Sequence, residues 1–152
     1  MIVYLDFDGV LFDTVSIIKD LIKKNNIDLN SDCQLFFENL DWEYILKNSV
    51  EISDSINTVS ELRKEYDVKI LTHVSSKREQ IKKKQFIEKN FKDIEVIFVS
   101  KRINKNDHVN IENSILIDDS RKNVETWVNA GGKAVLFDGR NLKNLVEECL
   151  YV

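Results

Sequence analysis

Residues 3–11 read VYLDFDGVL, a short apolar run that leads directly into two carboxylates and a glycine. A run of this length and composition is typical of a buried strand. While a strand continues, side chains two residues apart point the same way, which here applies to Asp6 and Asp8. Gly9 allows the backbone to turn sharply or to approach a ligand closely. Taken alone, the stretch fits equally well a strand-ending turn whose acids are solvated.

Other short apolar runs resemble the one at residues 2–5 and predict further buried strands, at residues 68–71, 94–99, 115–117 and 134–137. Charge-rich segments of helical length lie between them, with apolar residues at spacings of three and four, at residues 56–66, 78–91, 122–129 and 142–150. Strands that alternate with helices predict βαβ units, and therefore a parallel sheet that is covered on both faces.

The first two strands are separated by about sixty residues, although one crossover helix needs only about a dozen. These residues read as mostly helical, at 15–24 and 33–47. We therefore expect a small helical cap, residues 14–53, inserted after the first strand. The fold class predicted for residues 1–152 is a single α/β domain, with a Rossmann-like parallel sheet of about five strands flanked by helices.

The chain has 152 residues and a formal net charge of −4, with 43% apolar and 32% charged residues. This balance is typical of an ordered globular domain, and the acidic charge disfavours sequence-independent binding to nucleic acid or anionic lipid. No apolar run is long enough for a membrane span, and we expect no signal peptide at the start. Cys33 and Cys149 are far apart in sequence, so both are expected to be reduced thiols in a cytoplasmic protein.

Several enzyme classes are excluded by the residues that the chain lacks. Its four glycines match neither a Walker loop nor a dinucleotide-binding fingerprint. Its two histidines provide no zinc triad and no HExxH motif. The sequence also has no Gly-x-Ser-x-Gly elbow, which excludes the usual serine hydrolase arrangement.

Polar side chains follow other predicted strands as well. The run at 115–117 leads into the adjacent carboxylates Asp118 and Asp119, and the run at 68–71 leads into the hydroxyl of Thr72. Residues 101–105, just after the strand at 94–99, form a loop rich in basic residues. Ligand sites in parallel α/β sheets lie at the carboxyl ends of strands, so these groups are expected to meet at one edge.

Four carboxylates at one edge require a cation. Two carboxylates about 4 Å apart repel by about 4 kcal/mol at an effective dielectric constant near 20. Their pKa values would therefore rise far above the ordinary range unless a positive charge lay among them. The available ligands are hard oxygens, which favours Mg²⁺ over zinc. A magnesium ion beside a carboxylate nucleophile, a hydroxyl and a lysine describes a phosphate site.

These motifs resemble, in order, the four motifs of the haloacid dehalogenase superfamily. The resemblance covers nearly all of the chain from residue 2 to about residue 138. Residues 6–10 (DFDGV) match the first motif, residues 70–72 (ILT) the second, Lys105 the third and Asp118-Asp119 the fourth. Response-regulator receivers use similar residues, but their acidic pair comes first and their phosphorylated aspartate lies in mid-chain.

The resemblance implies that Asp6 attacks phosphorus and forms an aspartyl-phosphate. It implies that Asp8 protonates the leaving oxygen and then deprotonates the attacking water. Thr72 and Lys105 would hold the phosphoryl oxygens. The Mg²⁺ ligands would be the Asp6 carboxylate, the Asp8 carbonyl and Asp119, with Asp118 in a supporting role. The sequence does not distinguish these last two acids.

A finer resemblance points to the 5′(3′)-deoxyribonucleotidase group and its bacterial and phage relatives. It rests on residues 6–13, residues 36–40 (FFENL), residues 71–72 with Lys84 downstream, and residues 116–120. Asn123, Trp127 and the glycine pair at 131–132 also match that group. The resemblance therefore implies a nucleotide as substrate.

The function expected is thus a Mg²⁺-dependent phosphomonoesterase, acting on a small phosphorylated metabolite that is most simply a nucleotide. Two alternatives remain open within the enzymes: a phosphatase of another small metabolite, or one of nucleic-acid 3′ ends. A catalytically idle phosphate-binding or regulatory protein is the alternative from another class. The expected partners include no membrane, nucleic acid is disfavoured, and the oligomeric state stays open.

Some candidate residues have competing interpretations. Phe37 could line a nucleoside pocket or belong to the core. His73 could contact phosphate through its backbone amide alongside Gly9, and Lys101 competes with Lys105 for the third motif. The basic residues between 77 and 84 are expected to form a solvated helix face rather than a nucleic-acid patch, with Lys84 as the exception.

Overall fold

A computed structural model describes residues 1–151 of the chain. Its centre is a five-stranded sheet in the order β3-β2-β1-β4-β5, in which all neighbouring strands are parallel. The strands are β1 (Ile2–Leu5), β2 (Asp67–Val74), β3 (Glu95–Ser100), β4 (Ser114–Asp118) and β5 (Lys133–Leu136). The predicted parallel α/β sheet is therefore confirmed, although β5 begins and ends one residue earlier than expected.

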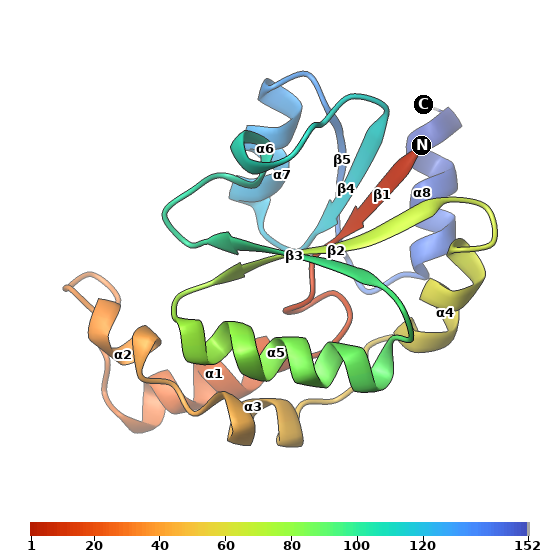
Figure 1. Ribbon diagram of the computed structural model, residues 1–152. Helices are drawn as coiled ribbons and strands as arrows, with labels where there is room; N and C mark the ends of the chain where they lie inside the picture. Colours follow the sequence, from red (N-terminus) through yellow and green to blue (C-terminus); the bar gives the residue numbers. More distant parts are fainter. Residues whose placement is uncertain (152) are drawn as a thin grey trace.

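Helices cover both faces of the sheet (Figure 1). They are α1 (Thr14–Lys24), α2 (Gln34–Glu38), α3 (Trp42–Asn48), α4 (Ser55–Leu62), α5 (Lys77–Asn90), α6 (Lys105–His108), α7 (Arg121–Asn129) and α8 (Leu142–Tyr151). The short helix α6 begins at Lys105, the last residue of the predicted basic loop, and was not predicted from the sequence. It places the side chain of Lys105 in the interior.

Successive residues of β1 belong to two separate cores, because a strand covered on both faces points its side chains alternately to each. Val3 and Leu5 lie in the larger core, which also contains buried residues of α4, α5 and α8. Tyr4 lies in the smaller core, where its ring meets that of Trp127 from α7 edge-on at 5.6 Å. Helices on both faces hold β1 in place, and the strand leads into Asp6 at its end.

The insertion after β1 contains α1, α2 and α3, as a helical cap should. Helix α3 packs against α5, and α1 packs against α3 (Figure 1). The prediction of one helix over residues 33–47 is wrong, since α2 ends at Glu38 and α3 begins at Trp42. The carboxylate of Asp41 accepts a hydrogen bond from the Tyr44 N–H at 3.1 Å, and this N-cap starts a new helix.

The two ends of the insertion lie side by side just beyond β1. The Asp13 N–H donates to the Val50 carbonyl at 2.8 Å, and the Ile52 N–H donates to the Leu11 carbonyl at 3.0 Å. The insertion therefore leaves and re-enters the sheet domain at one place, next to the carboxyl end of β1.

Two expectations from composition concern the whole chain. No helix within residues 1–151 has the combination of length and apolar character that crossing a bilayer requires. Cys33 and Cys149 are both free thiols.

Candidate active site

Asp6 directly follows β1 and continues its hydrogen-bond ladder, since its N–H donates to the carbonyl of Ile117 at 2.9 Å. Its buried carboxylate lies 2.9 Å from the Lys105 ammonium. Burial and the neighbouring Asp118 raise the pKa of Asp6 to about 7, although Lys105 acts in the opposite direction. A further positive charge beside Asp6 would therefore stabilise its ionised form.

Asp118 ends β4 and is fully buried, yet the protein satisfies both of its oxygens. One oxygen accepts from the Lys105 ammonium at 2.6 Å and from the Asn123 amide at 3.0 Å. The other accepts from the Ser120 N–H at 2.9 Å. Asp118 therefore holds Lys105 in position against Asp6, which fits a supporting role.

Asp119 is the exposed member of the adjacent pair. Burial of part of its side chain and the charge of Asp118 raise its pKa to about 6. Gly9 makes room for this carboxylate: a Cβ at Gly9 would lie 2.2 Å from Asp119 Oδ2. Gly9 also has a φ of +77°, which side chains rarely tolerate, so both space and backbone require glycine here.

The acids at the ends of β1 and β4 fit a divalent cation. Asp6, Asp118 and Asp119 each offer a carboxylate oxygen within 4.8 Å of the others. Hard oxygen ligands of this kind suit Mg²⁺, and a cation there would offset the burial and the mutual repulsion that raise the pKa values of Asp6 and Asp119. Both carboxylate oxygens of Asp118 accept hydrogen bonds from the protein, which leaves oxygens of Asp6 and Asp119 as the ligands available to an ion.

Asp8 belongs to a different cluster of polar groups. The strand ends at Leu5, and the chain then turns, with the N–H groups of Leu11 and Phe12 both donating to the Phe7 carbonyl. The Asp8 carboxylate accepts from the hydroxyl of Thr14 at 2.6 Å. The alternation of side chains along a strand therefore does not apply to Asp6 and Asp8, because β1 ends at Leu5 and does not continue through them.

Two further groups, both from the next strand and helix, bind the same carboxylate. The Thr72 hydroxyl lies 3.3 Å from Asp8 Oδ2, and the Lys83 ammonium lies 2.5 Å from it. Burial alone would raise the pKa of Asp8, but Lys83 and the Thr14 hydroxyl hold it below its ordinary value. Asp8 is therefore an ionised, firmly held carboxylate, in contrast to Asp6.

The position of Lys83 corrects the prediction for the basic residues of α5. Lys83 has no exposed surface, whereas the side chain of Lys84 is 62% exposed and reaches only Glu88, at 4.0 Å. The resemblance singled out Lys84, and it is the preceding lysine that turns inward. The prediction of a fully solvated helix face is wrong at this one residue.

Lys83 is enclosed by groups from α5 itself and from the cap. Its ammonium donates to the carboxylate of Glu79 at 2.7 Å and to the His73 carbonyl at 3.1 Å. It also lies 4.4 Å from the centre of the Trp42 ring in α3. Glu79, Lys83 and Ile87 recur every four residues on the buried face of α5, and this spacing could have identified Lys83 from the sequence.

Other predicted site residues lie around these two clusters. Thr72 is fully buried in β2, directly before His73. The imidazole Nε2 of His73 donates to the Ile103 carbonyl at 2.8 Å, which ties β2 to the loop before Lys105. Burial and the nearby lysines lower the pKa of His73 to about 4, so the ring is neutral at pH 7. Lys101 is exposed, and it is Lys105 that contacts Asp6.

Phe37 lies in the cap on α2. It is half-buried, packs against the larger core, and meets Phe36 edge-to-face at 5.4 Å between ring centres. These contacts are those of a packing residue at the margin of the core. Its role in a nucleoside pocket stays a prediction.

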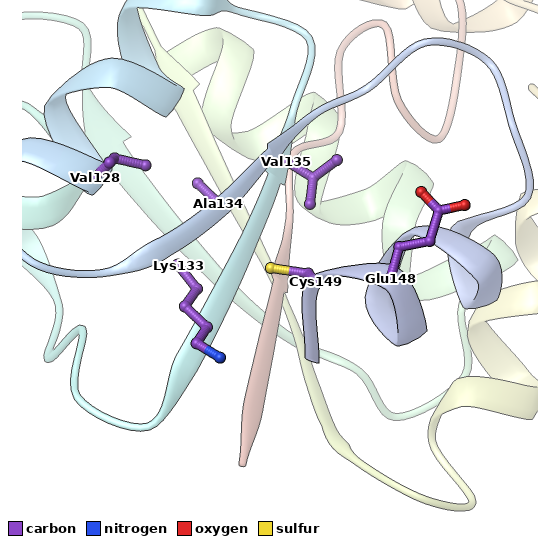
Figure 2. A pocket seen from close by; sticks show the side chains of 6 residues that line it. All are labelled: Val128, Lys133, Ala134, Val135, Glu148 and Cys149. Atoms are coloured by element: carbon purple, nitrogen blue, oxygen red, sulfur yellow. The ribbon is translucent and has the colours of Figure 1, made fainter. Parts of the chain in front are cut away.

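A separate hollow lies along the outer edge of β5, between α7 and α8 (Figure 2). It is lined by Val128, Lys133, Ala134, Val135, Glu148 and Cys149. None of the acids at the ends of β1 and β4 lines it. The chemistry of the site therefore lies at the carboxyl edge of the sheet and not in this hollow.

Asp6→Asn should change how the stability of the metal-free protein depends on pH. The folded-state pKa of about 7 lies above the ordinary value, so between about pH 4 and about pH 7 the native state holds the extra proton. This group therefore makes the free energy of unfolding fall as the pH rises through that range. Asn cannot titrate, so urea unfolding at several pH values should show a shallower fall in the variant. Parallel curves for the two proteins would contradict the raised pKa.

Lys83→Met should destabilise the protein strongly, because it leaves Asp8 and Glu79 without their shared cation. Removing one member of a buried ion pair costs about 3–5 kcal/mol. Lys84→Met is the matched control, and a substitution at that exposed site should change stability by less than about 0.5 kcal/mol. Urea midpoints of the two variants measure the difference. Adding Glu79→Gln to Lys83→Met should recover part of the loss, and equal midpoints for the two single variants would refute the buried contact.

Comparisons with known proteins bear on the fold. No family model matches the chain, and no curated protein is similar to it in sequence. A hydrolase from Streptococcus pneumoniae TIGR4 has a similar structure, with a TM-score of 0.54 and 16% identity over 99% of this chain and 98% of that one. A haloacid dehalogenase-like family hydrolase from Xanthomonas campestris has a TM-score of 0.55 and 16% identity, covering 88% and 81%.

YfnB of Bacillus subtilis, which is assigned to the haloacid dehalogenase-like (HAD) hydrolases and is bound to magnesium, is similar over 97% of each chain. Its TM-score is 0.57 and its identity is 14%. Identities this low establish the fold alone. The chain therefore has the α/β fold of the HAD hydrolases, with a helical insertion after β1.

Proposed function

We propose that the protein is a Mg²⁺-dependent phosphomonoesterase of the HAD superfamily, with Asp6 as its nucleophile. The observation that carries the proposal is the placement of Asp6, whose carboxylate lies against Lys105 and within one cluster with Asp118 and Asp119. A nucleophilic carboxylate needs positive charge around it to accept a phosphate, and this cluster is built to take a cation. The hydrolases that share the fold, and the magnesium bound to YfnB, support the same assignment.

In the first half of the proposed reaction, an Asp6 oxygen attacks phosphorus and the bond to the leaving oxygen breaks. The leaving oxygen takes its proton from the Asp8 carboxyl. Lys83 favours the ionised form of Asp8 in the resting protein, but the negative charge of an arriving phosphate raises the pKa of a carboxyl beside it. The Thr72 hydroxyl and the Lys105 ammonium hold phosphoryl oxygens while charge moves onto them.

In the second half, the Asp8 carboxylate takes a proton from water. The water oxygen attacks phosphorus, the bond from phosphorus to Asp6 breaks, and inorganic phosphate leaves. Asp8 is then protonated and Asp6 is again a free carboxylate, so the cycle closes. The ion pair with Lys83 suits this half, because it keeps Asp8 ionised and ready to accept the proton.

The Mg²⁺ of this proposal would be held by the carboxylates of Asp6 and Asp119 and by the carbonyl of Asp8, with Asp118 supporting through Lys105. When bound, the ion supplies charge neutralisation for the phosphoryl oxygens and for the crowded carboxylates. Gly9 is part of this arrangement, since a side chain there would displace Asp119.

Variants of the two carboxylates test the mechanism through phosphate release with and without Mg²⁺. Asp6→Asn should abolish release, because an amide is no nucleophile. Asp8→Asn should lower the rate by about 10²–10⁴ on a nucleotide, and by less on p-nitrophenyl phosphate, whose leaving group needs little protonation. Asp107→Asn, on the exposed surface of α6, is the control. Equal losses of rate on both substrates would show that Asp8 is not the general acid. A wild-type protein that binds phosphomonoesters but releases no phosphate from them would be a catalytically idle binding protein.

We further propose that the natural substrate is a nucleotide, with the cap as the part that contacts the nucleoside. The support is the resemblance of residues 36–40 to the deoxyribonucleotidases and the aromatic pair that α2 presents at the margin of the core. Phe37 is only half-buried, so part of its side chain is accessible.

Phe37→Ala distinguishes a nucleoside pocket from simple packing. Stacking of a base on an aromatic ring contributes about 1–3 kcal/mol, so KM for a nucleotide should rise by about five- to a hundredfold relative to p-nitrophenyl phosphate. If the ring only packs, the variant should instead lose about 3–5 kcal/mol of stability and impair both substrates alike. Kinetics on the two substrates and the melting temperature of this variant decide between the two.

A further inference from the structure

Three strands of the sheet end in the same kind of sequence, a serine followed by two basic residues. The tripeptides are residues 76–78 (SKR) after β2, residues 100–102 (SKR) at the end of β3, and residues 120–122 (SRK) after β4. We call their six basic residues the basic rim: Lys77, Arg78, Lys101, Arg102, Arg121 and Lys122. They are concentrated here although the chain as a whole has a net charge of −4.

The topology places the basic rim around the proposed phosphate site. All of the strands are parallel, so β2, β3 and β4 end at the same edge as β1. In the order β3-β2-β1-β4, two basic pairs lie on one side of Asp6 and the third lies on the other. Neighbouring strands are about 4.8 Å apart, so the rim spans roughly 14 Å of the edge before its side chains are counted. Helices α5 and α7, which carry two of the pairs, lie on opposite faces of the sheet (Figure 1).

The rim is available to a ligand. All six side chains are exposed, and none forms an ion pair within the described part of the chain, residues 1–151. Acids do occur nearby, but Arg140 neutralises Asp138, and Asp107 stands on the surface of α6. Lys101 is close enough to contribute to lowering the pKa of Asp8, so its positive charge reaches the site.

Fold stability does not account for these cations. Arg121 and Lys122 are the first two residues of α7, whose first turn has no acid, and Lys77 and Arg78 begin α5, where the one acid of the first turn, Glu79, is buried against Lys83. Positive charge in the first turn opposes the helix dipole and costs stability. Residues that break a local rule in this way mark sites where function sets the choice.

We propose that the basic rim binds phosphate groups of the substrate other than the one that is removed. The substrate class is therefore a phosphomonoester with further phosphates, which is the chemistry of an oligonucleotide end or of a compact polyphosphorylated metabolite. This inference rests on the proposed phosphatase function and narrows its substrate. It also qualifies the argument from net charge, because the field at the site is set by the local cations and not by the average over the surface.

A series of thymidine substrates with the same scissile bond tests the proposal. The series is thymidine 3′-phosphate, thymidine 3′,5′-bisphosphate and a thymidine tetranucleotide with a 3′-phosphate, or the corresponding 5′-phosphates if those are hydrolysed faster. At low salt, kcat/KM should be about tenfold higher for the best substrate with added phosphates than for the monophosphate, as expected for a few exposed charge contacts. This ratio should shrink as salt is added. If kcat/KM for the bisphosphate already shows the whole tenfold increase, the substrate is a compact polyphosphorylated metabolite. If only the tetranucleotide shows the increase, the substrate is a nucleic-acid end.

Two double variants provide the matched comparison. Lys77→Gln with Arg78→Gln, at the start of α5, should lower the ratio to about two or three, whereas Lys89→Gln with Lys92→Gln, in the last turn of α5 and just beyond its end, should leave it unchanged. Both variants remove two exposed positive charges, so only their position differs. A wild-type ratio near one, or an equal loss in both variants, would overturn the proposal.

Equilibrium binding tests the basic-rim proposal independently of the proposed phosphatase function. A fluorescein-labelled tetranucleotide with a terminal phosphate is titrated into the wild type and both variants at low salt, and anisotropy is read without turnover. Weaker binding by the Lys77/Arg78 variant alone supports the rim even if no substrate is hydrolysed, in which case the phosphatase assignment is wrong. Hydrolysis with equal binding by all three proteins refutes the rim and leaves the phosphatase assignment standing.

Discussion

The mutual repulsion of Asp6, Asp118 and Asp119 is the interaction that the rest of the site has to offset. Their oxygens come within 4.8 Å of one another at the ends of two adjacent strands, where burial removes much of the screening by water. Lys105 supplies one positive charge, and the amide of Asn123 and the Ser120 N–H stabilise Asp118. These contacts leave the pKa of Asp6 near 7, so the strand order produces a group of acids that could hold a cation.

Asp8 is held by an opposite arrangement. One carboxylate receives a lysine and two hydroxyls, from α5, α1 and β2, and its pKa falls below the ordinary value. The pKa values of these two aspartates, only two residues apart in sequence, therefore shift in opposite directions, because Asp6 lies beside Asp118 and shares Lys105 with it, whereas Asp8 receives Lys83 and two hydroxyls. The proposed reaction starts with Asp6 ionised and Asp8 protonated, so a cation beside Asp6 and the charge of an arriving phosphate beside Asp8 would have to reverse this order of pKa values.

The strands and the acids at their ends could be predicted because both depend on local sequence. Short apolar runs identify β1 and β4, and a carboxylate that follows such a run has to lie at the edge of the sheet. The partner of Lys83 could not be predicted in the same way, since this lysine reaches a carboxylate 75 residues earlier in the chain, and its spacing with Glu79 and Ile87 indicates only that it faces inward. Helix α6 was missed because four residues give no periodicity, and the break before α3 was missed because one N-cap, Asp41, outweighs a continuous helical pattern.

The contact between Trp42 and Lys83 joins the helical insertion after β1 to the candidate active site. Trp42 belongs to the inserted helix α3, and the lysine against its ring also holds Asp8. A cap joined in this way is not an exchangeable module. Any change in the insertion has to preserve the surroundings of Lys83, so the residues around Trp42 are constrained together with Asp8 rather than with the rest of the insertion.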